Sequence, residues 1–109
     1  MLKMVFLVHR RPDMDEQEFH RYWRDTHGPI ARKIPGLRKY VQNHSTAAAD
    51  GTRPPYDGFA EMWFDSADSF ATPEFQAALA DTPNFLDVER VKSLSFEQVE
   101  FVTYQPMQS

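Results

Sequence analysis

Four short stretches of the chain carry the alternating or continuous apolar pattern that is typical of β-strands. Their predicted ranges are residues 3–10, 37–44, 56–64 and 94–104. The first stretch is apolar on both faces, with Phe6 on one face and Val5 and Leu7 on the other. A strand with two apolar faces has to be covered on both sides.

The segment between the first two strands has the three- and four-residue spacing of a helix that buries one face. Asp15 followed by Glu18 predicts its start, as an acidic form of the capping box. The Gly28-Pro29 pair predicts a kink or a break directly after His27, because proline lacks a backbone donor and crowds the preceding turn. The predicted inward positions of this helix are Phe19, Trp23, His27, Ile30 and Ile34.

A second helical region is predicted after the third strand. The Asp65-Ser66 pair can cap its start, and the prolines in Thr72-Pro73 and Thr82-Pro83 predict that it is divided into short pieces. Residues 45–55 connect the second and third strands and are rich in turn-forming residues. We expect them to form a long loop, a candidate lid over a site.

The predicted order is βαββαβ, which indicates an α+β fold of the ferredoxin-like kind. In this fold a four-stranded antiparallel sheet carries its helices on one face. The chain has 109 residues, so we expect residues 1–109 to form a single domain. The other face of the sheet is apolar as well, and monomers rarely expose so large an apolar patch. The pattern therefore predicts a homodimer that forms through the sheet face.

Composition narrows the possible environments and partners. The chain has no cysteine, which excludes disulfides and thiol catalysis. Its net charge of −4 argues against general binding to nucleic acid. The apolar stretch at residues 4–8 is shorter than a signal-peptide core, and no run is long enough to span a membrane. We expect a cytoplasmic protein that binds no membrane.

The first helix and the following strand share a recognisable set of residues. This set resembles the EthD family of the dimeric α+β barrel proteins, in which two ferredoxin-like subunits pack sheet against sheet. The resemblance covers nearly the whole chain. It is carried by Phe19, Tyr22, Trp23, His27-Gly28-Pro29, Pro35-Gly36-Leu37 and Tyr40.

The resemblance also implies chemistry. Similar proteins include cofactor-independent methylmuconolactone isomerases and fungal polyketide tailoring enzymes, which remove protons from activated carbon. In the isomerase, a histidine matching His27 and a tyrosine matching Tyr40 lie in the pocket, and a cysteine contributes as well. This chain has the histidine and the tyrosine but not the cysteine.

His27 and Tyr40 are the candidate catalytic residues. A buried His27 stays neutral near pH 7 and can accept a proton, although a core histidine bonded to a backbone carbonyl fits the same spacing. Tyr40 can donate to a substrate carbonyl, or it can simply pack its ring. Asp25 lies on a different face of the helix and is not expected to orient His27.

Four further residues are candidates for substrate binding: Trp23, Glu61, Trp63 and Gln98. Glu61 stands between aromatic residues on a predicted central strand. It can serve as an acid or base with a raised pKa, or it can pair with an arginine across the dimer interface. The two tryptophans can equally be core residues or pocket walls.

Three functions are compatible with these residues. The leading one is a cofactor-free isomerase, lyase or cyclase of small-molecule catabolism or secondary metabolism. The alternatives are a protein that binds a hydrophobic metabolite without converting it, and haem-dependent oxidation with His27 as axial ligand. No cofactor is expected, because nucleotide-binding motifs are absent and His20 and His27 lack further metal ligands at familiar spacing.

Overall fold

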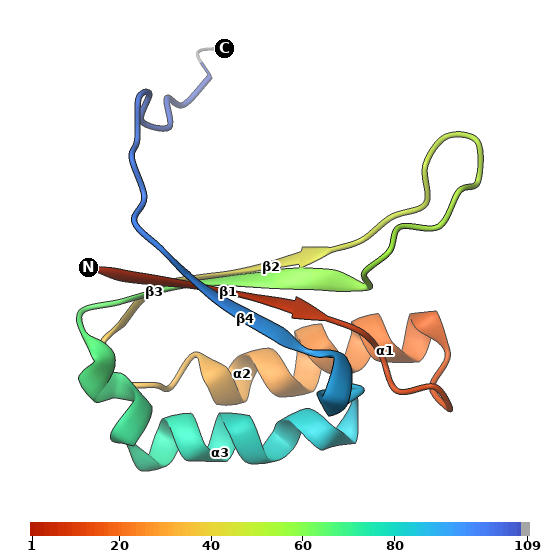
Figure 1. Ribbon diagram of the computed structural model, residues 1–109, viewed down its shortest axis with the longest axis horizontal. Coiled ribbons are helices and arrows are strands. Elements are labelled where there is room, and N and C mark those ends of the chain that lie inside the picture. The colour runs from red at the N-terminus through yellow and green to blue at the C-terminus, as the bar shows by residue number, and fades with distance from the viewer. Residues whose placement is uncertain (108–109) are drawn as a thin grey trace.

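The computed structural model describes residues 1–107, in which helices cover one face of a four-stranded antiparallel sheet (Figure 1). The strand order is β2-β3-β1-β4, and the predicted ferredoxin-like α+β fold is confirmed. None of the helices within residues 1–107 is both long and apolar enough to cross a membrane. The elements in chain order are β1 (Leu2–Val8), α1 (Glu16–Tyr22), a π-helical turn (Trp23–His27), α2 (Gly28–Ala31), β2 (Leu37–His44), β3 (Gly58–Phe64), a 3₁₀ helix (Ala67–Ala71), α3 (Pro73–Asp81), two 3₁₀ turns (Thr82–Asn84 and Val88–Arg90) and β4 (Lys92–Phe96).

The sequence predicts a kink or a break after His27, and the structure shows a change of helix type at that position and no break. The backbone of both His27 and Gly28 keeps helical dihedral angles, and α1 continues into α2 through the π-helical turn. In this wider turn the N–H of Gly28 donates to the carbonyl of Trp23, five residues earlier. Pro29 follows this turn directly, and the wider π-helical turn lets the helix continue past a residue that lacks a backbone donor. The disruption is therefore a bulge at His27 within a continuous helix.

The last strand is shorter than the predicted range 94–104. It ends at Phe96, which pairs with Lys3 of β1, and β1 begins at Leu2. Beyond Phe96 the chain runs past the end of its neighbour, so the alternating residues that follow have no strand to pair with. Residues 97–107 leave the sheet and are exposed (Figure 1).

The core lies between the helices and the inner face of the sheet. Trp23, Phe19, Phe64 and Phe85 are its largest fully buried side chains. Trp23 packs directly on the backbone of Gly58, where an added Cβ would lie 2.7 Å from the indole ring. This close approach holds the π-helical turn, and with it His27, against the sheet.

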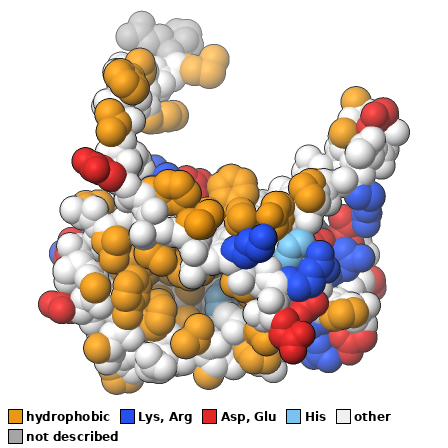
Figure 2. Space-filling view, viewed as in Figure 1, with side chains coloured by type: hydrophobic (Ala, Val, Ile, Leu, Met, Phe, Trp, Pro, Cys, Tyr) orange, Lys and Arg blue, Asp and Glu red, His pale blue; other side chains and the backbone are white. Residues whose placement is uncertain are grey.

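The outer face of the sheet carries no helix and is largely apolar. One row across it joins Val41, Glu61, Val5 and Leu94, and in the neighbouring rows Phe59 and Phe96 are exposed. The β2–β3 loop and residues 97–107 both project from the sheet on this side (Figure 1). Hydrophobic side chains extend along this side and onto the C-terminal segment (Figure 2). We call this surface the open face.

Candidate active site

A cavity of about 300 Å³ lies between the helices and the inner face of the sheet. Most of its lining is apolar, and its polar groups come from five side chains: Trp23, His27, Tyr40, Thr82 and Ser93. Figure 2 shows hydrophobic side chains around a hollow between the sheet and the helices, with a histidine visible inside it. An apolar cavity with a few convergent polar groups is the usual form of a small-molecule site.

His27 is paired with Asp81, which ends α3. The distance from His27 Nδ1 to Asp81 Oδ2 is 2.9 Å, and both side chains are about 10% exposed. The other carboxylate oxygen of Asp81 accepts hydrogen bonds from the hydroxyl of Tyr22 (2.6 Å) and the amide of Asn84 (2.9 Å). Asp81 is thus held in one orientation by three donors, and it in turn orients the imidazole.

The ionisation of this pair follows from burial and bonding. Burial lowers the pKa of His27 below 6.5, although the bond and charge of Asp81 act in the opposite direction. Burial by itself raises the pKa of Asp81, but the bonds from Tyr22, Asn84 and His27 outweigh it and lower that pKa. At neutral pH a neutral His27 therefore donates its Nδ1–H to a charged Asp81. Its Nε2 keeps a lone pair that can accept a proton.

Tyr40 contributes a proton donor to the same cavity. The amide nitrogen of Gln42 donates to the Tyr40 hydroxyl at 2.8 Å and to the Trp23 carbonyl at 2.9 Å. Because the Tyr40 oxygen already accepts a bond, and no acceptor within residues 1–107 takes its proton, that proton is available to a bound molecule. Burial raises the pKa of Tyr40, so the phenol stays protonated at neutral pH.

The structure brings Trp23, His27 and Tyr40 together around the cavity. Glu61, Trp63 and Gln98 lie elsewhere, on the open face and the segment that follows β4. The predicted raised pKa of Glu61 is wrong. Burial does raise that pKa, but bonds from Asn43 (2.9 Å) and Lys3 (3.0 Å) outweigh it and lower it. Within the chain Glu61 forms an ion pair with Lys3.

Trp63 and Gln98 contact each other across the open face. The indole N–H of Trp63 donates to the side-chain oxygen of Gln98 at 2.9 Å. The ammonium groups of Lys3 and Lys39 lie 4.6 and 4.8 Å from the centre of the Trp63 ring, in cation–π contact. These residues form a polar and aromatic cluster separated from His27 by the sheet.

Asp81 and Gln42 were not predicted as site residues from the sequence. Asp81 lies three positions after the buried Ala78 of α3, so helical spacing places it on the inward side. Gln42 alternates with Tyr40 on the inner side of β2, which is a weaker signal because any polar residue fits there. Asp25, which was not expected to orient His27, is exposed and bonded to Arg24 at 3.0 Å.

Replacing Asp81 with asparagine is expected to lower the pKa of His27 further. The carboxylate favours the charged imidazolium through both its hydrogen bond and its charge, and the variant loses the charge. An NMR titration of the His27 ring checks this, with a value below 6.5 in the wild type and a lower one in Asp81→Asn. Asp25→Asn is the matched control and should leave the value unchanged. A higher His27 pKa in Asp81→Asn would contradict the assigned pairing.

A family model matches most of this chain. The family model of the EthD domain matches residues 11–89. An uncharacterized protein of Rhodococcus erythropolis, from the thcB–thcC intergenic region, is 29% identical over 85 residues, which cover 74% of this chain and 81% of that protein.

Two solved structures show the same architecture. An EthD family protein of Bacillus halodurans superposes with a TM-score of 0.72 at 25% identity, covering 91% of this chain and all of that one. A dimeric protein of unknown function with a ferredoxin-like fold, from Bacteroides fragilis, superposes with a TM-score of 0.65 at 15% identity, covering 89% of this chain and 95% of that one.

Proposed function

Because this chain belongs to the EthD family, we propose that it is a cofactor-independent isomerase, lyase or cyclase acting on a small carbonyl compound. His27 acts as general base and Tyr40 as hydrogen-bond donor to the carbonyl. The observation that carries the proposal is the His27–Asp81 pair at the wall of an apolar cavity that also contains the Tyr40 hydroxyl.

The chemistry begins with proton transfer from carbon. The Nε2 lone pair of His27 takes a proton from the carbon next to the carbonyl. The electron pair of that C–H bond forms a carbon–carbon double bond, and the π pair of the carbonyl moves onto its oxygen. Tyr40 donates to the oxygen as its negative charge grows, and Asp81 stabilises the imidazolium that forms. Return of the proton to a different carbon gives an isomer. Departure of a leaving group with its bonding electrons from the carbon β to the carbonyl gives a lyase reaction, and attack of the enolate carbon on an electrophilic carbon of the same molecule gives a cyclase reaction.

The lining of the cavity supports a hydrophobic substrate. The side chains around His27 and Tyr40 include Phe6, Met62 and Phe75. Such surroundings exclude water from the enolate and strengthen the hydrogen bond from Tyr40, because electrostatic interactions gain strength in a low dielectric. Lactones and phenolic ketones combine an acidic C–H bond with this apolar character.

We further propose that a second copy of the chain covers the open face. Leu94, Phe59 and Phe96 are exposed there in the single chain, and Val5 lies between Leu94 and Glu61. The dimeric relative from Bacteroides fragilis supports the assembly. In this arrangement Glu61, Trp63 and Gln98 belong to the interface and not to the active site.

A second candidate function is storage or transport of a hydrophobic metabolite. The observation in its favour is the small number of polar groups in the cavity, since an apolar molecule can be held there by packing alone. In that case the His27–Asp81 pair serves to satisfy two buried polar groups.

Deuterium exchange distinguishes the two functions. The wild-type protein is incubated in D₂O with a panel of lactones and phenolic ketones, and mass spectrometry measures binding and deuterium uptake at carbon. A base in the cavity should exchange the acidic C–H of a bound compound faster than buffer does. Compounds that bind and show no faster exchange between about pH 5 and 9 would favour the storage function.

A further inference from the structure

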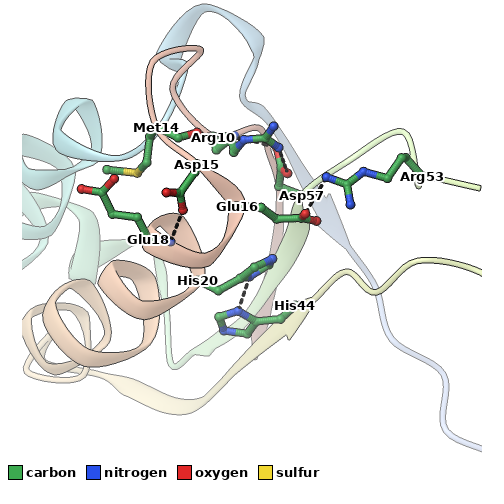
Figure 3. A network of polar contacts seen from close by, with 9 residues as sticks. All are labelled: Arg10, Met14, Asp15, Glu16, Glu18, His20, His44, Arg53 and Asp57. Atoms are coloured by element: carbon green, nitrogen blue, oxygen red, sulfur yellow. Dashed lines mark hydrogen bonds and ion pairs between the residues drawn. The ribbon is translucent and has the colours of Figure 1, made fainter. Parts of the chain in front are cut away.

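His20 and His44 lie opposite each other outside the cavity and form what we call the histidine pair. His20 projects from α1 toward His44, the last residue of β2 (Figure 3). Their Nδ1 atoms are 2.7 Å apart, and both side chains are half-buried. Spacing along the helix relates His20 to His27, but the structure pairs each of them with a different residue.

Gln42 joins the histidine pair to Tyr40. Its side-chain oxygen lies 2.8 Å from His44 Nε2, and its amide nitrogen donates to the Tyr40 hydroxyl at 2.8 Å. The same nitrogen donates to the Trp23 carbonyl at 2.9 Å. An unbroken series of hydrogen bonds therefore runs from His20, outside the cavity, to Tyr40, which lines it.

The direction of each bond in this series follows from its partners. The carbonyl of Trp23 can only accept, so Gln42 turns its amide nitrogen toward that carbonyl and its oxygen toward His44. His44 must therefore donate from Nε2. Burial, together with the charges of His20 and Arg24, lowers the pKa of His44 to about 4, so the ring is neutral at pH 7 and its Nδ1 has no proton. The 2.7 Å contact then requires His20 to donate from its own Nδ1.

We propose that Gln42 and His44 are positioning residues for Tyr40, and that His20 fixes the tautomer of His44 that this role requires. The role depends on the proposed function, in which Tyr40 donates to a substrate carbonyl. Every bond in the series has its donor on the side away from the cavity, so the proton of the Tyr40 hydroxyl is left for the bound molecule. Each bond in such a series polarises the next one and strengthens it.

The Gln42 amide has a second orientation, in which Tyr40 would lose its free proton. With the two ends of the amide exchanged, its oxygen would face the Tyr40 hydroxyl and accept that proton. Trp23 opposes the exchange because its carbonyl would face the amide oxygen, and His44 opposes it because its Nε2–H would face the amide hydrogens. Gly28 leaves room for the observed orientation, since an added Cβ would lie 3.1 Å from the amide nitrogen.

Packing on the core holds the histidine pair in place. The His44 ring lies 4.3 Å from Trp23 and the His20 ring lies 5.0 Å from Phe19, measured between ring centroids. Both of these core residues are almost fully buried, and Trp23 belongs to the same π-helical turn as His27. The same core therefore positions the proposed base and the histidine pair.

The tautomer of His44 can be measured in the wild-type protein. Nitrogen-15 NMR of the histidine rings at pH 7 should show a neutral His44 ring with its proton on Nε2 and a bare Nδ1. It should also show a scalar coupling between the Nδ1 atoms of His44 and His20, because a hydrogen bond joins them. A neutral His44 ring with its proton on Nδ1 would overturn the proposal, because Nε2 could then not donate to Gln42.

Two variants test the effect on Tyr40. Gln42→Met keeps the length of the side chain, and His44→Phe keeps a ring on Trp23. Burial raises the pKa of Tyr40 and the bond from Gln42 lowers it, so Gln42→Met should raise this pKa and His44→Phe should change it in the same direction. Deuterium exchange of a bound carbonyl compound should slow about tenfold, the effect of one neutral hydrogen bond, with binding little changed. His9→Phe, at a buried position outside the cavity, is the matched control and should change neither quantity.

Fluorine NMR of protein containing 3-fluorotyrosine measures this pKa, with the signal of Tyr40 assigned from Tyr40→Phe. If Tyr40 donated to Gln42, loss of the bond would lower the pKa. A lowered or unchanged value in folded Gln42→Met protein would therefore overturn the positioning role, with folding checked by circular dichroism. These NMR measurements need no substrate. Failure of the wild-type protein to exchange any compound would count against the proposed function, whereas the tautomer and the pKa would still test the bonds from His20 to Tyr40.

Discussion

Replacing His27 with glutamine is expected to slow deuterium exchange of a bound carbonyl compound by about 10²- to 10⁴-fold, the usual contribution of a positioned general base. Glutamine can still hydrogen-bond to Asp81 but cannot accept a proton from carbon. Binding of the compound should change little, because the apolar lining that holds it is unaltered. The measurement is the exchange rate at saturating compound, followed by mass spectrometry.

His9→Gln is the matched control, because His9 is also buried but lies outside the cavity. The pH dependence gives a second check. A general base must be neutral, so the wild-type rate should rise with pH and level off above the pKa of His27, which lies below 6.5. Two results would exclude His27 as the base. One is deuterium exchange by His27→Gln at the wild-type rate, and the other is a wild-type exchange rate that falls as pH rises from 5 to 7.

Replacing Leu94 with glutamate is expected to convert the proposed dimer into monomers. Leu94 is 46% exposed in the single chain, so the variant should fold, but the proposed dimer buries the new carboxylate against apolar side chains. An unpaired buried charge costs several kcal/mol, and a two-fold interface contains it twice. The dissociation constant should therefore rise at least about 10³-fold. Analytical ultracentrifugation measures the change in mass.

Ala80→Glu provides the comparison for this variant. It adds the same charge at an exposed position of α3, on the helical side of the molecule, and should leave the dimer intact. A wild-type protein that sediments as a monomer at micromolar concentration would contradict the proposed interface. So would a Leu94→Glu protein that keeps the mass of the dimer.

Much of the fold was predictable because it depends on local periodicity. Alternation along β3 correctly grouped Ala60, Met62 and Phe64, which are buried together. The spacing along the first helix likewise grouped Phe19, Trp23 and His27, and all three are buried. Side-chain direction in a strand or a helix follows from the period of that element alone.

The same alternation does not predict which face of the sheet packs against the helices. Glu61 and Trp63 share a face with Phe59, and both faces of the strand contain large apolar residues, so the pattern is nearly symmetric. Packing of Trp23 on Gly58 and of the helices on Phe64 decides the question. This is why two residues assigned to the substrate site lie on the open face.

Tertiary structure decides where β4 ends and which side chains pair with His27 and His20. Residues 97–104 have the alternation of a strand, but β1 is too short to pair with them. Asp81 reaches His27 from 54 positions away, and His44 reaches His20 from 24. The sequence by itself determined which residues share a face of each element. Which faces meet depends on contacts between distant segments, because the period of one segment contains no information about the position of another.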